Sequence, residues 1–166
     1  MPAPAAIRSA ILLAACLMLP GAAAAQSAPP LLESYGRVAT LLNYMSVYVA
    51  ESLLACAEKN VLTEEQTEVR YAAYRKRNAA LLERAETWSQ QAEKRLQAQG
   101  EERAAQRVAE EAGLSAMAAA SARAQAMIGK AGDARAACAE ILAAIEAGRY
   151  DLSGNAEFVD LLKVNP

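Results

Sequence analysis

The chain has 166 residues, 17 of them basic and 19 acidic, so its formal net charge is −2 and gives no reason to expect nucleic acid or anionic lipid as a partner. It contains no histidine, which excludes Ser-His-Asp and Cys-His nucleophiles and any metal or haem site that uses imidazole. We therefore expect no metal, no cofactor and no catalysis. Alanine is abundant and β-branched residues are sparse, so the composition favours helix over strand.

The first segment has the features of a secretory signal peptide. Arg8 precedes an apolar run over residues 10–19, and small side chains at 23–25 stand before the predicted cleavage site. We expect residues 1–25 to be removed, which leaves a single helical domain over 26–166 in the periplasm or secreted.

The same segment allows two other interpretations. The string Leu13-Ala14-Ala15-Cys16 fits a lipoprotein box, in which Cys16 carries lipid and anchors the chain. Pro20-Gly21 stops the apolar run before the roughly 20 residues that a membrane-spanning helix requires, so no span is expected after processing.

The first predicted helix covers residues 31–58. Apolar side chains recur along it at steps of three and four, which makes one continuous apolar face, and further side chains widen that face. A helix this apolar is expected to be central and to contact two neighbours. The positions of the first face are Leu31, Tyr35, Val38, Leu42, Met45, Val49, Leu53 and Cys56.

Two further long helices and two shorter ones follow. Thr63, with Gln66 three residues later, predicts a capping box at the start of a helix that runs to residue 99. An alanine-rich helix over residues 101–130 is expected to approach its neighbour closely. Asp133 caps a shorter helix that Gly148 ends, and a last short helix is predicted over residues 155–162.

Short connections make neighbouring helices antiparallel, so we predict an all-α, up-down-up-down four-helix bundle with a short C-terminal helix. After cleavage the chain keeps two cysteines, Cys56 and Cys138, and this order places both near one end of the bundle. An exported chain with two cysteines is expected to join them in one disulfide, and two separately buried thiols are the alternative.

The fourth helix is too short to cover the end of the bundle that lies far from the disulfide. Leu32, Tyr35, Trp88 and Val108 fall near that level, and the terminal segment around Phe158 either covers them or joins them in an apolar groove or dimer surface. These five residues are the predicted partner groove.

Arg70, Arg77 and Arg84 fall seven residues apart on one stripe of the second helix. The functional interpretation is a docking strip for an anionic partner, and the alternative is an ordinary solvated face.

Several other side chains were considered as sites. Four tyrosines at 44, 48, 71 and 74 either line a phenol pocket or pack into the core, and core packing is the expected outcome. The methionines at 45, 117 and 127 are expected to fill the core. The acidic pairs at 101–102 and 110–111 are expected to lie on exposed faces, without a catalytic role.

The string Leu62-Thr63-Glu64-Glu65-Gln66 resembles the Leu-Thr-x-x-Gln signature of the helical periplasmic stress chaperones. That family is exported and all-helical, and the resemblance implies a concave surface that holds unfolded clients. It covers five residues, and no second copy of the motif is present.

The sequence as a whole therefore predicts an exported helical protein that binds or scaffolds another periplasmic or envelope protein and is not an enzyme. A chaperone-like protein and a small-ligand binder are the alternatives, and a homodimer is compatible with the predicted groove.

Overall fold

The computed structural model describes residues 30–166, and within this range it contains helices and no strand. The predicted signal segment over residues 1–25, and Cys16 within it, lie outside the described residues. The all-α prediction is confirmed for the described part. The α-helices are α1 (Pro30–Glu58), α2 (Glu64–Ala98), α3 (Glu102–Ala124), α4 (Ala134–Glu146) and α5 (Ala156–Leu161), with a π-helical turn η1 (Gln125–Gly129) and a 3₁₀ turn η2 (Leu152–Gly154).

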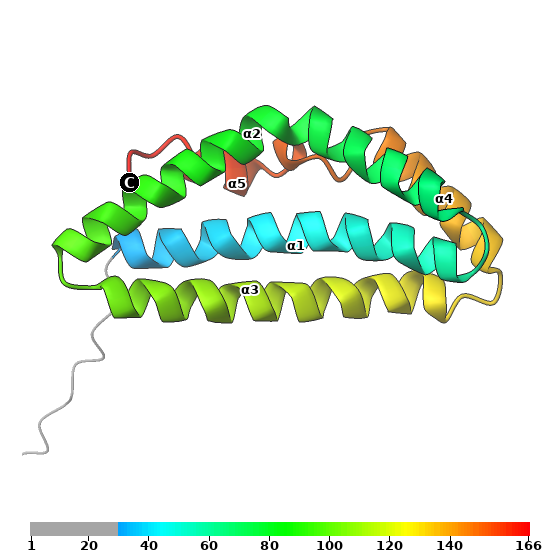
Figure 1. Ribbon diagram of the computed structural model, residues 1–166, viewed down its shortest axis with the longest axis horizontal. Coiled ribbons are helices and arrows are strands. Elements are labelled where there is room, and N and C mark those ends of the chain that lie inside the picture. Colours follow the sequence, from blue (N-terminus) through cyan, green and yellow to red (C-terminus); the bar gives the residue numbers. More distant parts are fainter. Residues whose placement is uncertain (1–29) are drawn as a thin grey trace, which may run out of the picture.

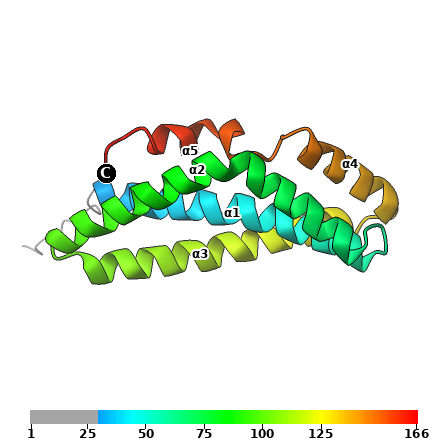
Figure 2. The ribbon, with the colours of Figure 1, turned by 45° about the horizontal axis from the view of Figure 1, so that its top comes forward.

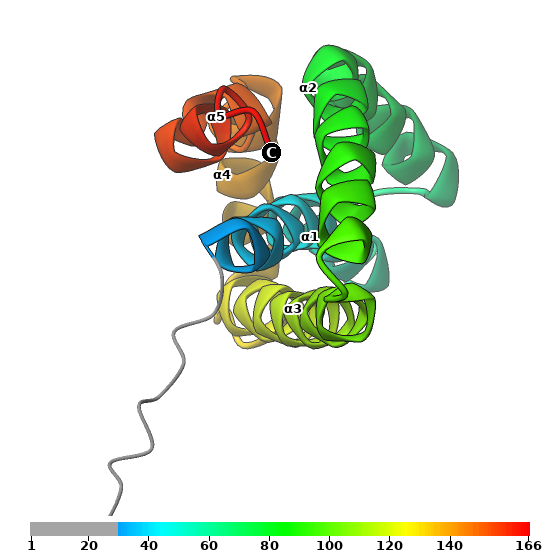
Figure 3. The same ribbon diagram turned by 90° about the vertical axis from the view of Figure 1, so that its left-hand side faces the viewer.

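Helix α1 lies in the middle of the molecule, as its apolar sequence predicts. It packs along α3 on one side and against α2, α4 and α5 on the other (Figures 1 and 3). Among the described helices, α1 alone is long and apolar enough to cross a membrane, a test that the core helix of a helical domain also passes. Its contacts with all four other α-helices account for its apolar composition.

A regular four-helix bundle is not confirmed. Helix directions alternate along the chain, but α1 lies between α3 and the remaining helices instead of sharing a square with them (Figure 3). Contact between α2 and α3 is sparse, and α2 arches away from α1 and α3 along the middle of its length (Figure 1). The space between α2 and α3, alongside α1, is therefore left partly open.

Small residues allow α3 to pack closely against α1. A Cβ atom built at Gly36 would lie 2.6 Å from Cγ1 of Val108, which is closer than two carbon atoms can approach. On α3 the buried side chains are alanines at 105, 116, 120 and 124. This close contact makes the parallel pair α1–α3 the tightest in the fold and explains why the predicted square arrangement does not form.

Helix starts follow the predicted caps. Thr63 Oγ1 accepts from the Gln66 backbone N–H at 3.2 Å, and Gln66 Oε1 accepts from the Thr63 N–H at 3.0 Å, so the predicted capping box is present. Asp133 caps α4 through the N–H groups of residues 135 and 136. Asn155 caps α5 through the Phe158 N–H at 3.0 Å.

The end of α3 differs from its prediction. A continuous helix to residue 130 was expected, but the α-helix ends at Ala124 and the chain continues as the wider turn η1. In that turn the Lys130 N–H donates to the Gln125 carbonyl, five residues back. Ile128 is fully buried there, in the core near the two cysteines.

The core has two parts. One surrounds Cys56 and Cys138, whose Cα atoms are 5.7 Å apart and whose Sγ atoms are at bonding distance. The pair is thus placed as a disulfide that ties α1 to α4. The second part lies toward the start of α1 and includes Val38, Trp88 and Phe158.

Candidate functional site

The five residues of the predicted partner groove do not form one groove. Leu32, Tyr35 and Trp88 are no more than 7% exposed, Phe158 is fully buried, and Val108 packs against the same core. After α4 the chain continues in the same direction along the molecule, and α5 lies over α1 beside α2 (Figures 2 and 3). The terminal segment supplies Phe158 and covers Trp88, which is the predicted alternative to an open groove on this face. Val108 instead packs against Gly36 on the α3 side of α1, and Tyr35 lines the cleft described below.

The C-terminal segment, residues 149–166, is held by polar contacts as well. Trp88 Nε1 donates to the Val164 carbonyl at 2.8 Å, and Arg37 donates to Glu157 from α1. The apolar side chains of this segment that are buried are Leu152, Phe158 and Leu162. Each end of the segment is therefore anchored to the helices beneath it.

The predicted anionic-partner strip contacts both α4 and the C-terminal segment. Arg70 pairs with Glu146 at the end of α4, and Arg77 binds both carboxylate oxygens of Asp151 at 3.1 and 3.2 Å. Arg84 donates to the Leu162 carbonyl at 3.0 Å. The three arginines do share one face, but their partners lie within the chain, so a docking strip for an external anion was the wrong interpretation.

Asn78 anchors the start of the segment from a buried position. Its Nδ2 donates to the Tyr74 carbonyl at 2.9 Å and to Asp151 Oδ1 at 3.2 Å. Its Oδ1 accepts from the Leu152 N–H at 2.7 Å. Asn78 is 2% exposed, and these three bonds satisfy its side chain, which explains a polar residue in the apolar row of α2.

The tyrosines pack into the core, as expected. The rings of Tyr44 and Tyr48 stack with centroids 6.1 Å apart, and Tyr150 meets Tyr48 edge-on at 5.1 Å. Arg123 lies over the Tyr48 ring at 5.4 Å, and the Tyr48 hydroxyl donates to the sulfur of Met127. These contacts form a structural cluster near the disulfide, whereas Tyr71 and Tyr74 line a hollow between α1 and α2.

The Tyr74 hydroxyl is buried without a hydrogen-bond partner among the described residues. Burial raises the pKa of Tyr74 to about 12. In the unfolded chain the phenol ionises near pH 10, so between pH 10 and 12 the unfolded state releases a proton that the folded state keeps. Stability contributed by the neutral phenol is therefore present below pH 10 and is lost as the pH rises through the folded pKa.

Tyr74→Phe is expected to leave the free energy of unfolding at pH 7 unchanged or to raise it by up to about 1 kcal/mol, because it removes a desolvated hydroxyl. The variant should also lose less stability than the wild type between pH 9 and 11. Urea unfolding at both pH values measures this, with Tyr71→Phe as the control at a half-buried tyrosine. An alkaline loss as steep as that of the wild type would contradict the assignment.

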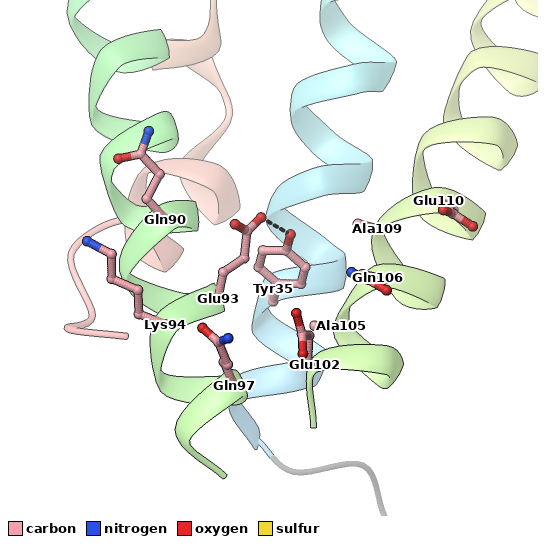
Figure 4. Close-up of a pocket in the computed structure, with 10 residues that line it drawn as sticks. All are labelled: Tyr35, Gln90, Glu93, Lys94, Gln97, Glu102, Ala105, Gln106, Ala109 and Glu110. Carbon is pink, nitrogen blue, oxygen red and sulfur yellow. Dashed lines mark hydrogen bonds between the residues drawn. The ribbon is translucent and has the colours of Figure 1, made fainter. Parts of the chain in front are cut away.

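An open cleft lies between α2 and α3, beside α1. It has a volume of about 480 Å³ and lies between the second half of α2 and the first half of α3, with Tyr35 of α1 at its floor (Figure 4). Its polar lining comes from two facing rows, Gln90, Glu93, Lys94 and Gln97 on α2 and Glu102, Gln106 and Glu110 on α3, with Ala105 and Ala109 between them.

A hydrogen bond joins the floor of the cleft to its wall. The Tyr35 hydroxyl donates to Glu93 Oε1 at 2.5 Å. Burial, and then the negative charge of Glu93, raise the pKa of Tyr35 well above its usual range. The phenol therefore stays protonated and holds the Glu93 carboxylate in place, with its other oxygen free to accept a donor.

The charge of the cleft is negative. Three carboxylates, Glu93, Glu102 and Glu110, face a single ammonium group, that of Lys94, and none of these four side chains makes an ion pair within residues 30–166. Carboxylates beside three glutamine amides suit a ligand that carries cationic and amide groups. No cluster of three or more acidic or cysteine side chains in this range is arranged to hold a metal ion.

Sequence reasoning found Tyr35 but missed the polar rows. Glu102 and Glu110 were expected to lie on exposed faces, and they are exposed, but they also form one wall of the cleft. The available signal was spacing: residues 90, 93 and 97, and residues 102, 106 and 110, recur at steps of three and four on two helices joined by a tight turn.

The Leu-Thr-x-x-Gln string has a structural role here. Thr63 and Gln66 form the capping box of α2, and Leu62 is buried beside the disulfide core. Of the three methionines, Met45 packs against the core, whereas Met117 and Met127 are 40% and 44% exposed, so core filling was wrong for these two.

Comparison of the chain with protein-family models, with curated proteins and with solved structures gave no match. The fold and the cleft geometry therefore carry the functional argument.

Proposed function

We propose that the protein is an exported, non-catalytic binding protein. The signal-like segment and a disulfide pairing typical of oxidising compartments support export to the periplasm. Mass spectrometry of the exported chain tests this, with Gln26 as the expected first residue. A lipid-modified Cys16 would show that the protein is exported with a lipid anchor instead of being released after Ala25, and an uncleaved N-terminus would contradict export.

The proposed binding site is the cleft over Tyr35, and its proposed ligand is a lysine or arginine side chain of a partner protein. The observation that carries this proposal is the Tyr35–Glu93 bond, which orients a carboxylate within a cleft where acidic groups outnumber basic ones. Hydrogen bonds between ionised groups are about twice as strong as neutral ones, and a preset carboxylate loses little freedom on binding.

The test uses a tripeptide of lysine with blocked ends, titrated calorimetrically into the disulfide-bonded protein at low salt. Glu93→Gln should weaken binding about three- to tenfold, because it removes the oriented charge while keeping the shape of the side chain. Glu111→Gln is the matched control, since Glu111 is exposed on α3 outside the cleft lining. Equal affinities for the wild type and the Glu93 variant, or no binding by the wild type, would refute the proposal.

A further inference from the structure

Three faces of α2 have different neighbours. With a rotation of about 100° per residue, Arg70, Arg77 and Arg84 fall on one face, which binds α4 and the C-terminal segment. The buried residues 74, 78, 85, 92 and 96 fall on a second face. The third face, residues 75, 79, 82, 86, 90, 93 and 97, lies opposite the arginine face and lines open space along most of the helix.

Two hollows share this third face. Besides the cleft over Tyr35, a second hollow of about 620 Å³ lies between α1 and the first half of α2. Its α1 lining includes Leu42, Asn43 and Ser46, and the Asn43 amide lies beside Gly113 of α3. Because Asn43 faces α3, the second hollow opens on the same side of α1 as the cleft. We name the pair the α2 groove.

The two ends of the α2 groove carry opposite charge. Arg75 and Lys76 line the end near the disulfide, and neither makes an ion pair within the described residues. Glu83 and Glu86 line the same hollow two to three turns further along α2, toward the cleft. Glu93, Glu102 and Glu110 line the far end. Arg75 and Glu93 are 18 residues apart on one helix, which corresponds to about 27 Å along its axis.

Between the charged ends the lining changes in character. In the second hollow, Leu42 and Leu82 provide apolar surface beside Glu83 and Glu86, and the cleft contains three glutamines, at 90, 97 and 106. A glutamine amide both donates and accepts, so it can pair with the N–H and C=O groups of a peptide backbone. A small polyamine has no acidic group for Arg75 and Lys76 and no backbone carbonyl for the glutamines.

We propose that the α2 groove binds one extended segment of a partner protein, about eight residues long, with an acidic group at one end and lysine or arginine at the other. The length follows from a span of about 27 Å and a rise of about 3.3 Å per residue in an extended chain. This inference rests on the proposed function, because it places the cationic end of the segment in the cleft over Tyr35.

The test compares two fluorescent eight-residue peptides. The first has the sequence Glu-Glu-Gly-Leu-Ser-Gly-Lys-Lys, and the second has glutamines in place of the two glutamates. Each peptide is also made with its sequence reversed, because the groove does not fix the direction of the bound chain. Measured by fluorescence anisotropy, the mixed-charge peptide should bind about tenfold more tightly than its glutamine counterpart in at least one direction. Arg75→Gln combined with Lys76→Gln should abolish that advantage and leave the affinity for trilysine unchanged. Arg107→Gln, at an exposed position of α3 outside both hollows, is the control.

The outcomes separate the two proposals. If trilysine binds but the acidic end adds no affinity, the extended-segment inference is overturned and the cleft remains a site for cationic groups. If neither peptide nor trilysine binds, both proposals fail. If sedimentation shows a dimer that dissociates in the Arg75 and Lys76 double variant, a second copy occupies the groove and the inference is again overturned.

Discussion

Replacing both Cys56 and Cys138 by alanine is expected to lower the free energy of unfolding by about 4–5 kcal/mol. The disulfide closes a loop between positions 82 residues apart, and the chain-entropy model assigns a stabilisation of this size to such a loop. Both side chains are fully buried in the core between α1 and α4, so alanine removes the bond without leaving a buried polar group. Urea unfolding followed by circular dichroism measures the change.

The wild type treated with a reducing agent is the natural comparison for this variant. Its stability should fall to nearly the same value, because both treatments release the same loop. A double variant as stable as the oxidised wild type, or labelling of both thiols in the native exported protein, would show that the two cysteines are not joined.

Phe158→Ala is expected to cost about 3–5 kcal/mol, the range for removing a fully buried aromatic ring. Phe158 is 0% exposed and belongs to the core that Trp88 and Val38 form beneath the C-terminal segment. Because the core around the disulfide is separate, the loss should concentrate in that segment. Limited proteolysis should then cut the variant near residue 150, while α1 to α4 stay intact.

Asp160→Ala provides the control for Phe158→Ala. Asp160 is exposed on the same short helix and pairs only with Lys163, three residues away, so its removal should change stability by less than about 0.5 kcal/mol. If the Phe158 variant resists protease as well as this control does, the C-terminal segment does not depend on its buried ring.

The elements of the fold follow from local sequence. The Thr63–Gln66 box, Asp133 and the glycines at 100 and 148 mark helix ends because each acts on backbone groups within a few residues. The pairing of Cys56 with Cys138 was also predictable, since helix direction and loop length placed both at one end.

Packing between helices was less predictable. The seven-residue spacing of the arginines correctly put them on one face, but nothing local says that Asp151 and the Leu162 carbonyl return to meet them. Likewise, the sequence left open whether the segment around Phe158 covers the groove or leaves it exposed, because the outcome depends on the path of the chain after α4. The outcome is decided by contacts between residues that are more than 70 positions apart in the chain.

The cleft was the hardest feature to predict. Glutamate and glutamine rows on α2 and α3 are typical of solvated faces, and sequence alone cannot distinguish a flat face from the wall of a hollow. The hollow arises because small residues such as Gly36 draw α3 onto α1 while α2 arches away (Figure 1). That balance between two helix pairs is a property of the whole fold.

Hydrogen–deuterium exchange with and without the mixed-charge peptide tests most directly the claim that one side of α2 is closed by the chain itself and the other is open to a partner. We predict slower exchange within residues 90–97 and 102–110 when the peptide is present, and unchanged exchange within residues 152–164. Slowing confined to residues 152–164, or no change anywhere, would contradict the account.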